Sequence, residues 1–156
     1  MKLICDEMLI GLARWLRAAG YDTRMCPSGA EDVAVLELAA IEGRTLLTRD
    51  RQILRQAGHR HAVLLLESES LEDQARELVR RLDVDWLNAP FTRCIIDNAR
   101  LRSAAVGALA KVPGTARSRG GPHRSCPSCG RVYWPGSHHR RMRARLRGWR
   151  AAGEVR

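Results

Sequence analysis

Long hydrophobic runs are absent from this chain of 156 residues. No apolar stretch approaches the roughly 20 residues that a membrane-spanning helix requires. The chain also shows no positively charged start followed by an apolar leader. We therefore expect no membrane partner and a cytoplasmic location. The length suits one domain with a modest core and a small appended module.

Acidic residues are scarce in the second part of the chain. Residues 91–156 contain 15 Arg and Lys but 2 Asp and Glu, a net charge of +13, whereas residues 1–90 contain 12 and 15, a net charge of −3. A cationic segment joined to a carboxylate-rich body is typical of a catalytic domain with a segment that binds nucleic acid. Cations that neutralise phosphates release counterions, and this release supplies affinity without sequence preference. The alternative is that the abundance of Arg and Ala reflects genomic base composition.

Apolar patterns in the first 90 residues alternate between those of strands and those of helices. Short apolar runs predict strands at 3–5, 21–25, 44–48 and 62–66. Helical spacing predicts helices at 9–19, 29–42, 51–57 and 71–82. Ser28 with Glu31, and Ser70 with Asp73, are spaced as capping boxes. These units predict a small three-layer α/β domain with a parallel sheet.

Carboxylates lie at the ends of two of the predicted strands. Asp6 comes after the first strand, and Asp50 comes after the strand at 44–48. If these strands are parallel neighbours, both side chains emerge at the same edge of the sheet, where α/β proteins usually build their sites. Paired carboxylates suit a hard divalent ion such as Mg²⁺ or Mn²⁺, the inventory for metal-assisted phosphodiester cleavage. The alternative for Asp6 is a helix N-cap.

Further candidates lie near this edge in the sequence. Asp32 falls in the first turn of the second predicted helix, and Glu37 follows one and a half turns later. Either side chain would complete an acidic cluster, although the helix dipole also favours acids in a first turn. Arg14, Arg17 and Arg49 are candidates for phosphate contacts; the alternative is that each is a solvated arginine.

Cysteine spacing predicts a zinc site in the second part of the chain. Cys126-Pro-Ser-Cys129-Gly has the form of a zinc knuckle, in which two thiolates bind the ion. A second pair is needed, and Cys94 with Asp97 has the same spacing, with aspartate in place of the second cysteine. Rival fourth ligands are His123, His138 and His139. A redox C-x-x-C is the competing interpretation, but it lacks the expected strand–helix setting.

The remaining residues divide into a loop, a strand and a basic helix. Residues 101–124 show little periodicity and predict a flexible insertion, and Val132 to Trp134 predict a ribbon strand. Residues 138–150 predict a helix with Met142, Leu146 and Trp149 on one face. A membrane surface or a partner groove is the alternative use of such a helix. The predicted RNA contacts on it are Arg140, Arg141, Arg143, Arg145 and Arg147.

These motifs, in this order, resemble a known family. The resemblance rests on CDEMLIGLARWLRAAGYDT, Asp32 and Leu36, EGRTLLTRD, FTRC and CPSCGRVYWPGSHHRRM. They are similar to the PIN-like RNase domain called Mut-seven-C, which carries a zinc ribbon after its nuclease body. The resemblance implies a PIN-like fold, divalent-metal-dependent RNA cleavage, and acidic site positions at Asp6, Asp32 and Asp50, with Glu37 as a further position. The chain differs from that family at Asp97, where the ribbon has its second cysteine.

The sequence thus predicts three segments and two competing functions. Residues 1–88 are expected to form the PIN-like nuclease domain, residues 89–137 the zinc-ribbon-like module, and residues 138–156 an arginine-rich C-terminal helix or tail. The first hypothesis is a ribonuclease that uses Mg²⁺ or Mn²⁺ at Asp6 and Asp50, with structural Zn²⁺ in the ribbon. The second is a non-catalytic protein that binds RNA or the ribosome through the ribbon and the arginines.

Overall fold

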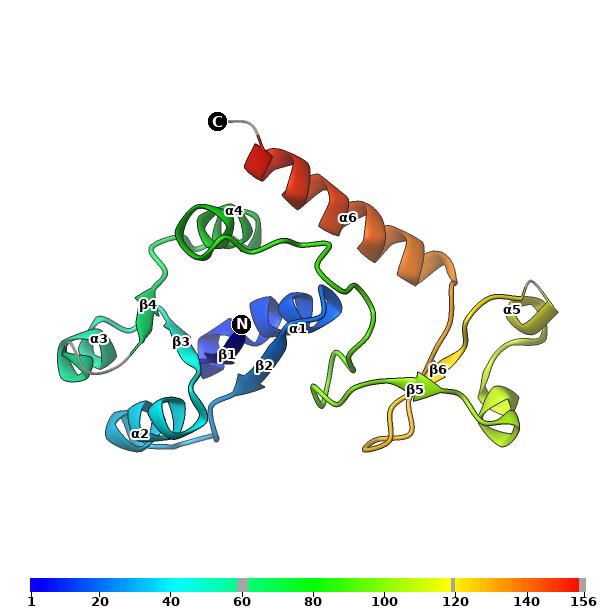
Figure 1. Cartoon of the computed structure of the whole chain (residues 1–156), viewed down its shortest axis with the longest axis horizontal. Coiled ribbons are helices and arrows are strands. Elements are labelled where there is room, and N and C mark those ends of the chain that lie inside the picture. Colours follow the sequence, from blue (N-terminus) through cyan, green and yellow to red (C-terminus); the bar gives the residue numbers. More distant parts are fainter. Residues whose placement is uncertain (59–61, 119, 155–156) are drawn as a thin grey trace.

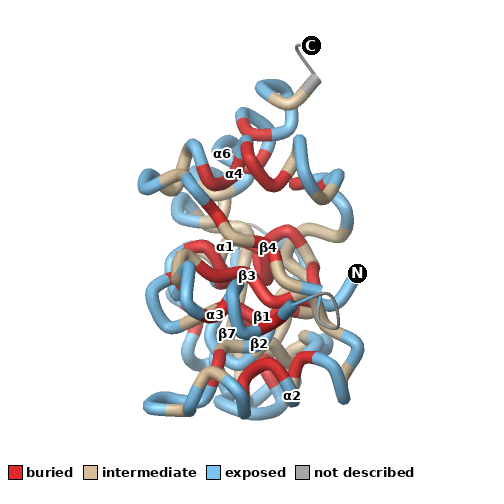
Figure 2. The backbone as a smooth tube through the Cα atoms, turned by 90° about the vertical axis from the view of Figure 1, so that its left-hand side faces the viewer, coloured by how far each residue is buried: buried red, intermediate tan, exposed pale blue. Residues whose placement is uncertain are grey.

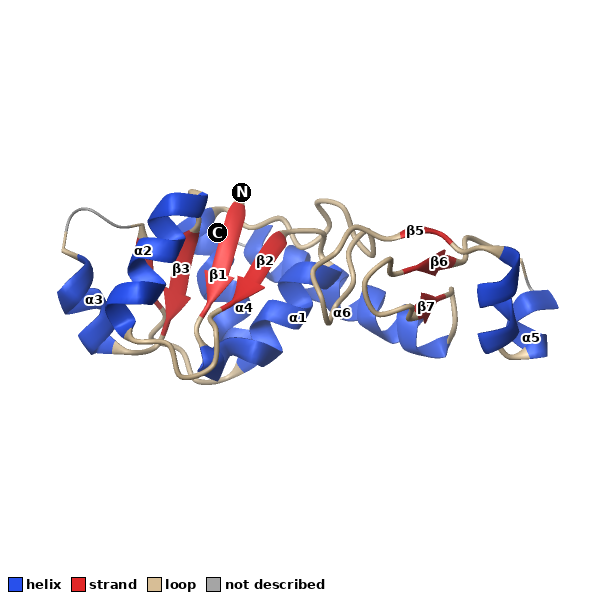
Figure 3. Ribbon diagram, turned by 90° about the horizontal axis from the view of Figure 1, so that it is seen from below, coloured by secondary structure: helices blue, strands red, loops and turns tan. Residues whose placement is uncertain are grey.

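A parallel sheet forms the first part of the molecule. The structure is a computed structural model that describes residues 1–58, 62–118 and 120–154. Its strands are β1 (Lys2–Cys5), β2 (Asp22–Met25), β3 (Thr45–Thr48) and β4 (Val63–Leu65), in the order β2-β1-β3-β4. All neighbours pair in parallel, and Figure 3 shows the arrows of β1, β2 and β3 pointing the same way. The predicted parallel α/β sheet is confirmed.

Helices cover both faces of this sheet (Figure 1). One core joins α1 (Ile10–Ala18) and α4 (Leu71–Leu82) to the face that carries Leu3, Cys5 and Leu47. A second core joins α2 (Asp32–Glu42) and α3 (Arg51–Ala57) to the face that carries Ile4 and Leu46. Alternate strand residues enter opposite cores because successive side chains of a strand point to opposite faces. The three layers therefore follow from central strands that are apolar on both sides, and Figure 2 shows β1 and β3 largely buried.

One predicted helix start is wrong. The second helix was expected to begin after a Ser28 cap, but α2 begins at Asp32, and its N-cap, Glu31, makes no side-chain capping hydrogen bond. The reason lies at Gly29, whose φ of +69° is a left-handed conformation that a right-handed helix cannot include. The predicted end is confirmed, because Gly43 caps the helix at φ +61°. The Ser70 cap of α4 is also confirmed, since its side chain accepts from the backbone N–H of Asp73.

A small antiparallel sheet forms the second part. Its strands are β5 (Arg102–Ser103), β6 (Arg124–Ser125) and β7 (Val132–Tyr133), and it lies beside the parallel sheet in Figure 3. The 101–124 segment was predicted to be largely an irregular insertion, but its described residues include η2 (Val106–Lys111) and α5 (Gly114–Ser118). Val112 is buried in this segment. The insertion therefore has local structure between β5 and β6. Sequence periodicity did not indicate these elements because they are short.

The C-terminal helix α6 (Ser137–Glu154) runs from the ribbon back to α4 (Figure 1). Leu146 and Trp149 are buried in the core that contains α1 and α4. Gly153 lies against Val79, where a Cβ atom would come within 2.5 Å of a methyl carbon, so glycine permits the close approach of the two helices. The arginine-rich segment is therefore not a free tail, because its Leu146 and Trp149 are part of the core of the first domain. Among the described helices, none is long and apolar enough to cross a membrane.

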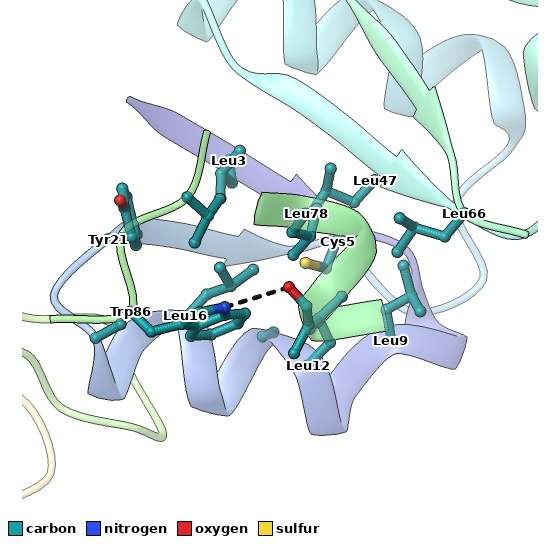
Figure 4. Close-up of a cluster of buried hydrophobic side chains, with 14 of the residues drawn as sticks. Leu3, Cys5, Leu9, Leu12, Leu16, Tyr21, Leu47, Leu66, Leu78 and Trp86 are labelled. Carbon is teal, nitrogen blue, oxygen red and sulfur yellow. Dashed lines mark hydrogen bonds between the residues drawn. The ribbon is translucent and has the colours of Figure 1, made fainter. Parts of the chain in front are cut away.

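Tryptophans hold this junction together. The Trp86 indole N–H donates to the backbone carbonyl of Ala75 at 3.2 Å, as Figure 4 shows. Its ring packs on Trp149 with centroids 4.7 Å apart, and Trp149 meets Trp15 edge to face at 4.9 Å. Such aromatic pairs add stabilisation beyond the area that they bury. One apolar stripe of α6 thus completes a core that the first 90 residues begin.

Leu146→Ala is expected to lower the free energy of unfolding by about 2–5 kcal/mol, because it deletes a fully buried side chain and leaves a cavity. The matched control, Leu54→Ala on α3, removes a leucine that is 39% exposed, and its expected cost is about 1 kcal/mol or less. Urea denaturation of both variants measures the difference. A loss at Leu146 no larger than the loss at Leu54 would mean that α6 is not part of the core.

Candidate functional site

Asp6 and Asp50 lie at one edge of the parallel sheet. β1 and β3 are adjacent and parallel, so the residues that follow them emerge together, as the sequence predicted. From β1 the chain passes through α1 to β2 on one side, and from β3 through α3 to β4 on the other. The two connections diverge, so the ends of β1 and β3 form the topological switch point of the sheet, where α/β proteins usually bind ligands. Asp6 and Asp50 follow these two strand ends.

Thr48 links the carboxylate of Asp6 to the backbone of Asp50. Its side-chain hydroxyl donates to Asp6 Oδ2 at 2.9 Å and accepts the backbone N–H of Asp50 at the same distance. Thr48 is fully buried at the end of β3, so this hydroxyl cannot turn toward water. The link fixes Asp6 relative to the start of α3. Sequence analysis missed this role, for which the only signal was a threonine that ends an apolar run.

Both aspartates also cap helices. Asp6 Oδ1 accepts the backbone N–H of Glu7, which begins the short helix η1 (Glu7–Leu9), and Asp50 Oδ1 accepts that of Gln52 in α3 at 2.7 Å. The capping interpretation of Asp6 is therefore correct for one oxygen, while the other faces Thr48. An aspartate with one oxygen in a cap and the other turned to a neighbouring site can serve both purposes.

Asp32 and Glu37 are placed differently from each other. Asp32 is half-buried at the start of α2, which follows β2 and therefore lies at the same sheet edge as Asp6. Glu37 is exposed, and the five-residue spacing places it about 140° around the helix from Asp32. The two side chains therefore do not face the same point. Within the described residues, the predicted carboxylates do not form a group of three or more meeting ligand atoms, whereas four residues of the ribbon do.

At the sheet edge, Asp6 and Asp50 offer carboxylate oxygens and Thr48 offers a hydroxyl. Mg²⁺ and Mn²⁺ prefer such hard ligands and bind through one or two carboxylates and several waters. The donor chemistry therefore fits these ions, with Asp6 and Asp50 as the residues that would hold one. Asp32, at the start of the helix that follows β2, is a further candidate on the same edge.

The three arginines predicted to contact phosphate beside this edge have different environments. Arg14 is exposed on α1. Arg49 follows β3 at the edge itself and forms an ion pair with Glu69 at 3.1 Å. Arg17 is 5% exposed, and its guanidinium donates to the backbone carbonyls of Thr23, Ile95 and Ile96. The prediction that Arg17 binds RNA is therefore wrong, because its buried guanidinium binds the chain around residue 95 to the first domain.

Cys94, Asp97, Cys126 and Cys129 form one cluster. Their ligand atoms all lie within 4.8 Å of one another. Cys94 Sγ is 3.9 Å from Cys129 Sγ, and Asp97 Oδ2 is 3.5 Å from Cys94 Sγ and 3.2 Å from Cys126 Sγ. A tetrahedral zinc site has sulfur–sulfur edges of about 3.8 Å and sulfur–oxygen edges of about 3.6 Å, from its usual bond lengths. The cluster could therefore hold a metal such as zinc.

The two halves of the cluster share one backbone geometry. Cys126 accepts from Gly130 through its carbonyl and donates to Arg131, and Cys94 accepts from Asn98 and donates to Ala99 in the same way. Gly130 has a φ of +68° and Asn98 a φ of +66°. Asparagine tolerates this left-handed conformation better than most residues, so it can stand where the other turn has glycine. Asp97 thus occupies the ligand position that corresponds to Cys129.

Protonation of the cluster depends on Asp97. Hydrogen bonds from the Cys129 and Cys126 thiols hold the pKa of Asp97 below its usual range, and the contact with Asp97 raises the pKa of Cys129 to about 12. Cysteine binds metal as thiolate, so an ion must displace these protons. The Tyr133 hydroxyl lies 3.0 Å from Cys94 Sγ, where it can donate to a thiolate. Sequence analysis did not identify Tyr133 as a partner of the cluster.

The predicted rival ligands lie outside the cluster. None of His123, His138 and His139 belongs to the group whose ligand atoms meet, within the residues that the structure describes. His139 instead packs on Phe91, with ring centroids 4.1 Å apart. Asp97 is therefore the fourth candidate ligand that the geometry favours.

A polar network holds the first half of the cluster against the first domain. Asp22 accepts from Arg44 at 2.8 Å and from the Asn98 side chain at 2.7 Å, and Arg93 lies 3.4 Å from it. Burial would raise the pKa of Asp22, but the hydrogen bonds from Asn98 and Arg44 outweigh it and hold the pKa below its usual range. The Asn98 side chain also accepts the backbone N–H of Thr23 at 3.0 Å. The cluster is therefore attached to β2.

The predicted arginines of α6 are all exposed: Arg140, Arg141, Arg143, Arg145 and Arg147. Arg145 nevertheless makes hydrogen bonds to both oxygens of Glu72, and its guanidinium lies 5.1 Å from the ring centroid of Trp15. Much of the Arg145 charge is therefore used to dock α6. Arg143 lies over Phe91 at 5.8 Å, beside the ribbon.

Comparison with known proteins bears on the site. Residues 1–146 match the family model of the Mut7-C RNAse domain. The chain is also similar to the Homo sapiens protein named "Exonuclease mut-7 homolog", with 33% identity over 97 residues that cover 60% of the chain and 11% of that protein. No solved structure matches the chain. The family supports a nuclease-type function at a coarse level. The chain therefore belongs to the Mut7-C RNAse domain family, as its motifs predicted.

Proposed function

We propose that this chain is a divalent-metal-dependent ribonuclease, with its catalytic site at the sheet edge where β1 and β3 end. The observation that carries the proposal is the hydrogen-bonded link from Asp6 through Thr48 to Asp50 at the sheet edge. Membership of a nuclease family supports it. The human relative is named an exonuclease, but the chain spans 11% of its length. The proposal therefore does not specify cleavage from an end or within the strand.

The chemistry of the proposed site divides among these residues. A divalent ion bound there supplies a Lewis acid that activates water and offsets charge on the phosphate. Asp6 and Asp50 would hold it, and Thr48 would keep the Asp6 carboxylate oriented so that it does not turn away. Arg49 at the edge of the site would approach the RNA phosphate, in exchange for its ion pair with the exposed Glu69.

Zinc is proposed as a structural ion in the cluster of Cys94, Asp97, Cys126 and Cys129. All four positions are then filled by protein ligands, which is typical of structural rather than catalytic zinc. The strands of the ribbon have two residues each, too few to form a core of their own. The ion would therefore stabilise much of the structure of the turn from Cys126 to Gly130.

One experiment separates the proposal from its alternative. The alternative is a non-catalytic protein that binds RNA or the ribosome in the cytoplasm through the ribbon and the arginines of α6. The purified chain is incubated with mixed single-stranded RNA and Mn²⁺, and the products are separated by size. A ribonuclease gives shortened fragments, whereas the alternative gives retarded complexes of full-length RNA.

The exposed arginines of α6 are expected to supply part of the RNA affinity. Replacing Arg140, Arg141 and Arg147 with glutamine should reduce the slope of log affinity against log salt by about 2, since each phosphate contact adds about 0.7 for single strands. Substitution is preferred to truncation because α6 also carries Leu146 and Trp149 of the core.

Binding measured at several salt concentrations tests this expectation. The matched control replaces three exposed arginines of α3 and α4 with glutamine: Arg55, Arg76 and Arg80. If both triple variants change the slope equally, the effect comes from net charge and not from α6.

A further inference from the structure

A groove lined by aromatic rings lies between the ribbon and the start of α6. One cavity of about 500 Å³ and a neighbouring one of about 290 Å³ share the same four rings. These rings are Phe91, Tyr133, Trp134 and His139. The two cavities together therefore form one aromatic groove, the name used below. It is separate from the proposed catalytic edge, which is formed by the ends of β1 and β3.

Trp134 occupies an unusual position for a tryptophan in this molecule. Trp15, Trp86 and Trp149 belong to or pack against the main core, whereas Trp134 is half-buried and belongs to neither core cluster. A Cβ atom on Gly136 would lie 2.9 Å from the Trp134 indole nitrogen, so glycine leaves room beside the ring. A large ring held at a surface groove, outside the core, is available to stack on a ligand.

Positive charge surrounds the aromatic groove. Arg131 is exposed on its wall, and Arg143 borders it with its guanidinium over the Phe91 ring. Arg93 and Arg124 also line it, although Arg93 already pairs with Asp22. Among the described residues that line either cavity, none is Asp or Glu. A ligand that fits must therefore combine a flat apolar group with negative charge.

We propose that the aromatic groove binds an unpaired base of single-stranded RNA, with the adjoining phosphates against Arg131 and Arg143. A nucleotide meets both demands, because every base has a face that stacks on aromatic rings and every linkage carries a negative charge. A base within a duplex is already stacked and cannot enter. This inference rests on the proposed function, because it assigns a second contact to the same RNA substrate.

The test measures binding of a fluorescein-labelled 12-nucleotide oligoadenylate to the full chain. Asp6→Asn is present in every protein so that the RNA stays intact. Trp134→Leu removes the stacking ring and should weaken binding about tenfold, within the usual range for one stacked base. It should leave the salt slope unchanged. Trp134→Phe keeps a ring and should restore most of the affinity.

Charge is tested separately from stacking. Arg131→Gln should lower the salt slope by about 0.7, the share of one phosphate on a single strand. The matched control is Arg55→Gln, the same substitution in the last turn of α3, which should leave the slope unchanged. Zinc content and circular dichroism confirm that each variant is folded.

Intrinsic fluorescence gives a readout that is independent of affinity and cleavage. RNA should quench the tryptophan emission of the Asp6→Asn protein, and Trp134→Phe should remove that quenching although three tryptophans remain. Persistent quenching in Trp134→Phe, or undiminished binding by Trp134→Leu, would overturn the inference. So would quenching by a glutamate-rich peptide but not by RNA, which would assign the groove to a protein partner.

The proposed function can fail separately. If the chain neither binds nor cleaves RNA, both proposals are wrong. If it cleaves RNA and Trp134→Leu binds normally, the aromatic groove alone is wrongly assigned.

Discussion

Asp6→Asn is expected to lower the rate of RNA cleavage by about 10³-fold or more. The substitution removes one negative charge from the proposed ion site. It keeps one oxygen that can accept the Glu7 backbone N–H, while the amide NH₂ takes the place of Oδ2 and can donate to the Thr48 hydroxyl oxygen. Metal activation supplies several kcal/mol to such reactions, and each 1.36 kcal/mol is a tenfold change in rate. Asp50→Asn should have a similar effect, and asparagine remains a good N-cap for α3.

Two comparisons isolate the role of charge at the site. Asp83→Asn makes the same chemical change at the C-cap of α4, where φ is +54° and asparagine is well tolerated, so its activity should match the wild type. Thr48→Ser keeps the linking hydroxyl and should retain activity, whereas Thr48→Val removes it and should not. Single-turnover rates measure all of these variants. Wild-type rates in Asp6→Asn, with contaminating nuclease excluded, would rule out the assignment.

Protein purified without added metal is expected to contain one zinc ion per chain. Cys126→Ser should reduce the zinc content to near zero, because it removes a buried thiolate from a site whose ligands are all protein atoms. Cys26→Ala is the matched control, since Cys26 is a buried thiol outside the cluster, and it should keep its zinc. Asp97→Cys should slow zinc loss to a chelator, because thiolate is the softer ligand.

Loss of zinc is expected to loosen the two turns of the cluster unequally. The turn from Cys94 to Asn98 is held to the body by Arg17 and Asp22 as well as by the ion. The turn from Cys126 to Gly130 makes backbone hydrogen bonds within itself. Hydrogen exchange after chelation should therefore rise at 126–131 and change little at 94–98. No zinc at all, with Cys126 and Cys129 oxidised to a disulfide, would show that Asp97 cannot complete the site.

Local signals predicted the sheet and its edge. The strands and helices of the first 90 residues follow from apolar spacing, and Asp6 and Asp50 could be placed because each lies within two residues of a strand end. The two turns of the cluster were also local, because the ligands occur in pairs at one spacing. The Ser28 capping box misled because its residues had the right spacing, but Gly29 broke the helix.

Contacts between distant residues could not be read in this way. Arg17 has the spacing of a helix-surface arginine, and its burial depends on carbonyls 78 and 79 residues away. The apolar stripe of α6 was visible in the sequence, but the sequence did not show whether it packs on this chain, a membrane surface or the groove of a partner. Only the fold shows that it completes the core of α1 and α4. Thr48 and Asn98 gain their roles from neighbours on other strands and turns.

The most direct test of the central claim is the rate of RNA cleavage as Mn²⁺ is raised, with zinc still bound. The account predicts no cleavage before Mn²⁺ is added and a rise to saturation in the wild type and in Asp83→Asn. In Asp6→Asn the rate should stay at least about 10³-fold lower at every Mn²⁺ concentration. Full cleavage without added divalent ion, or equal rates in Asp6→Asn and the wild type, would contradict a metal-dependent site at the edge of β1 and β3.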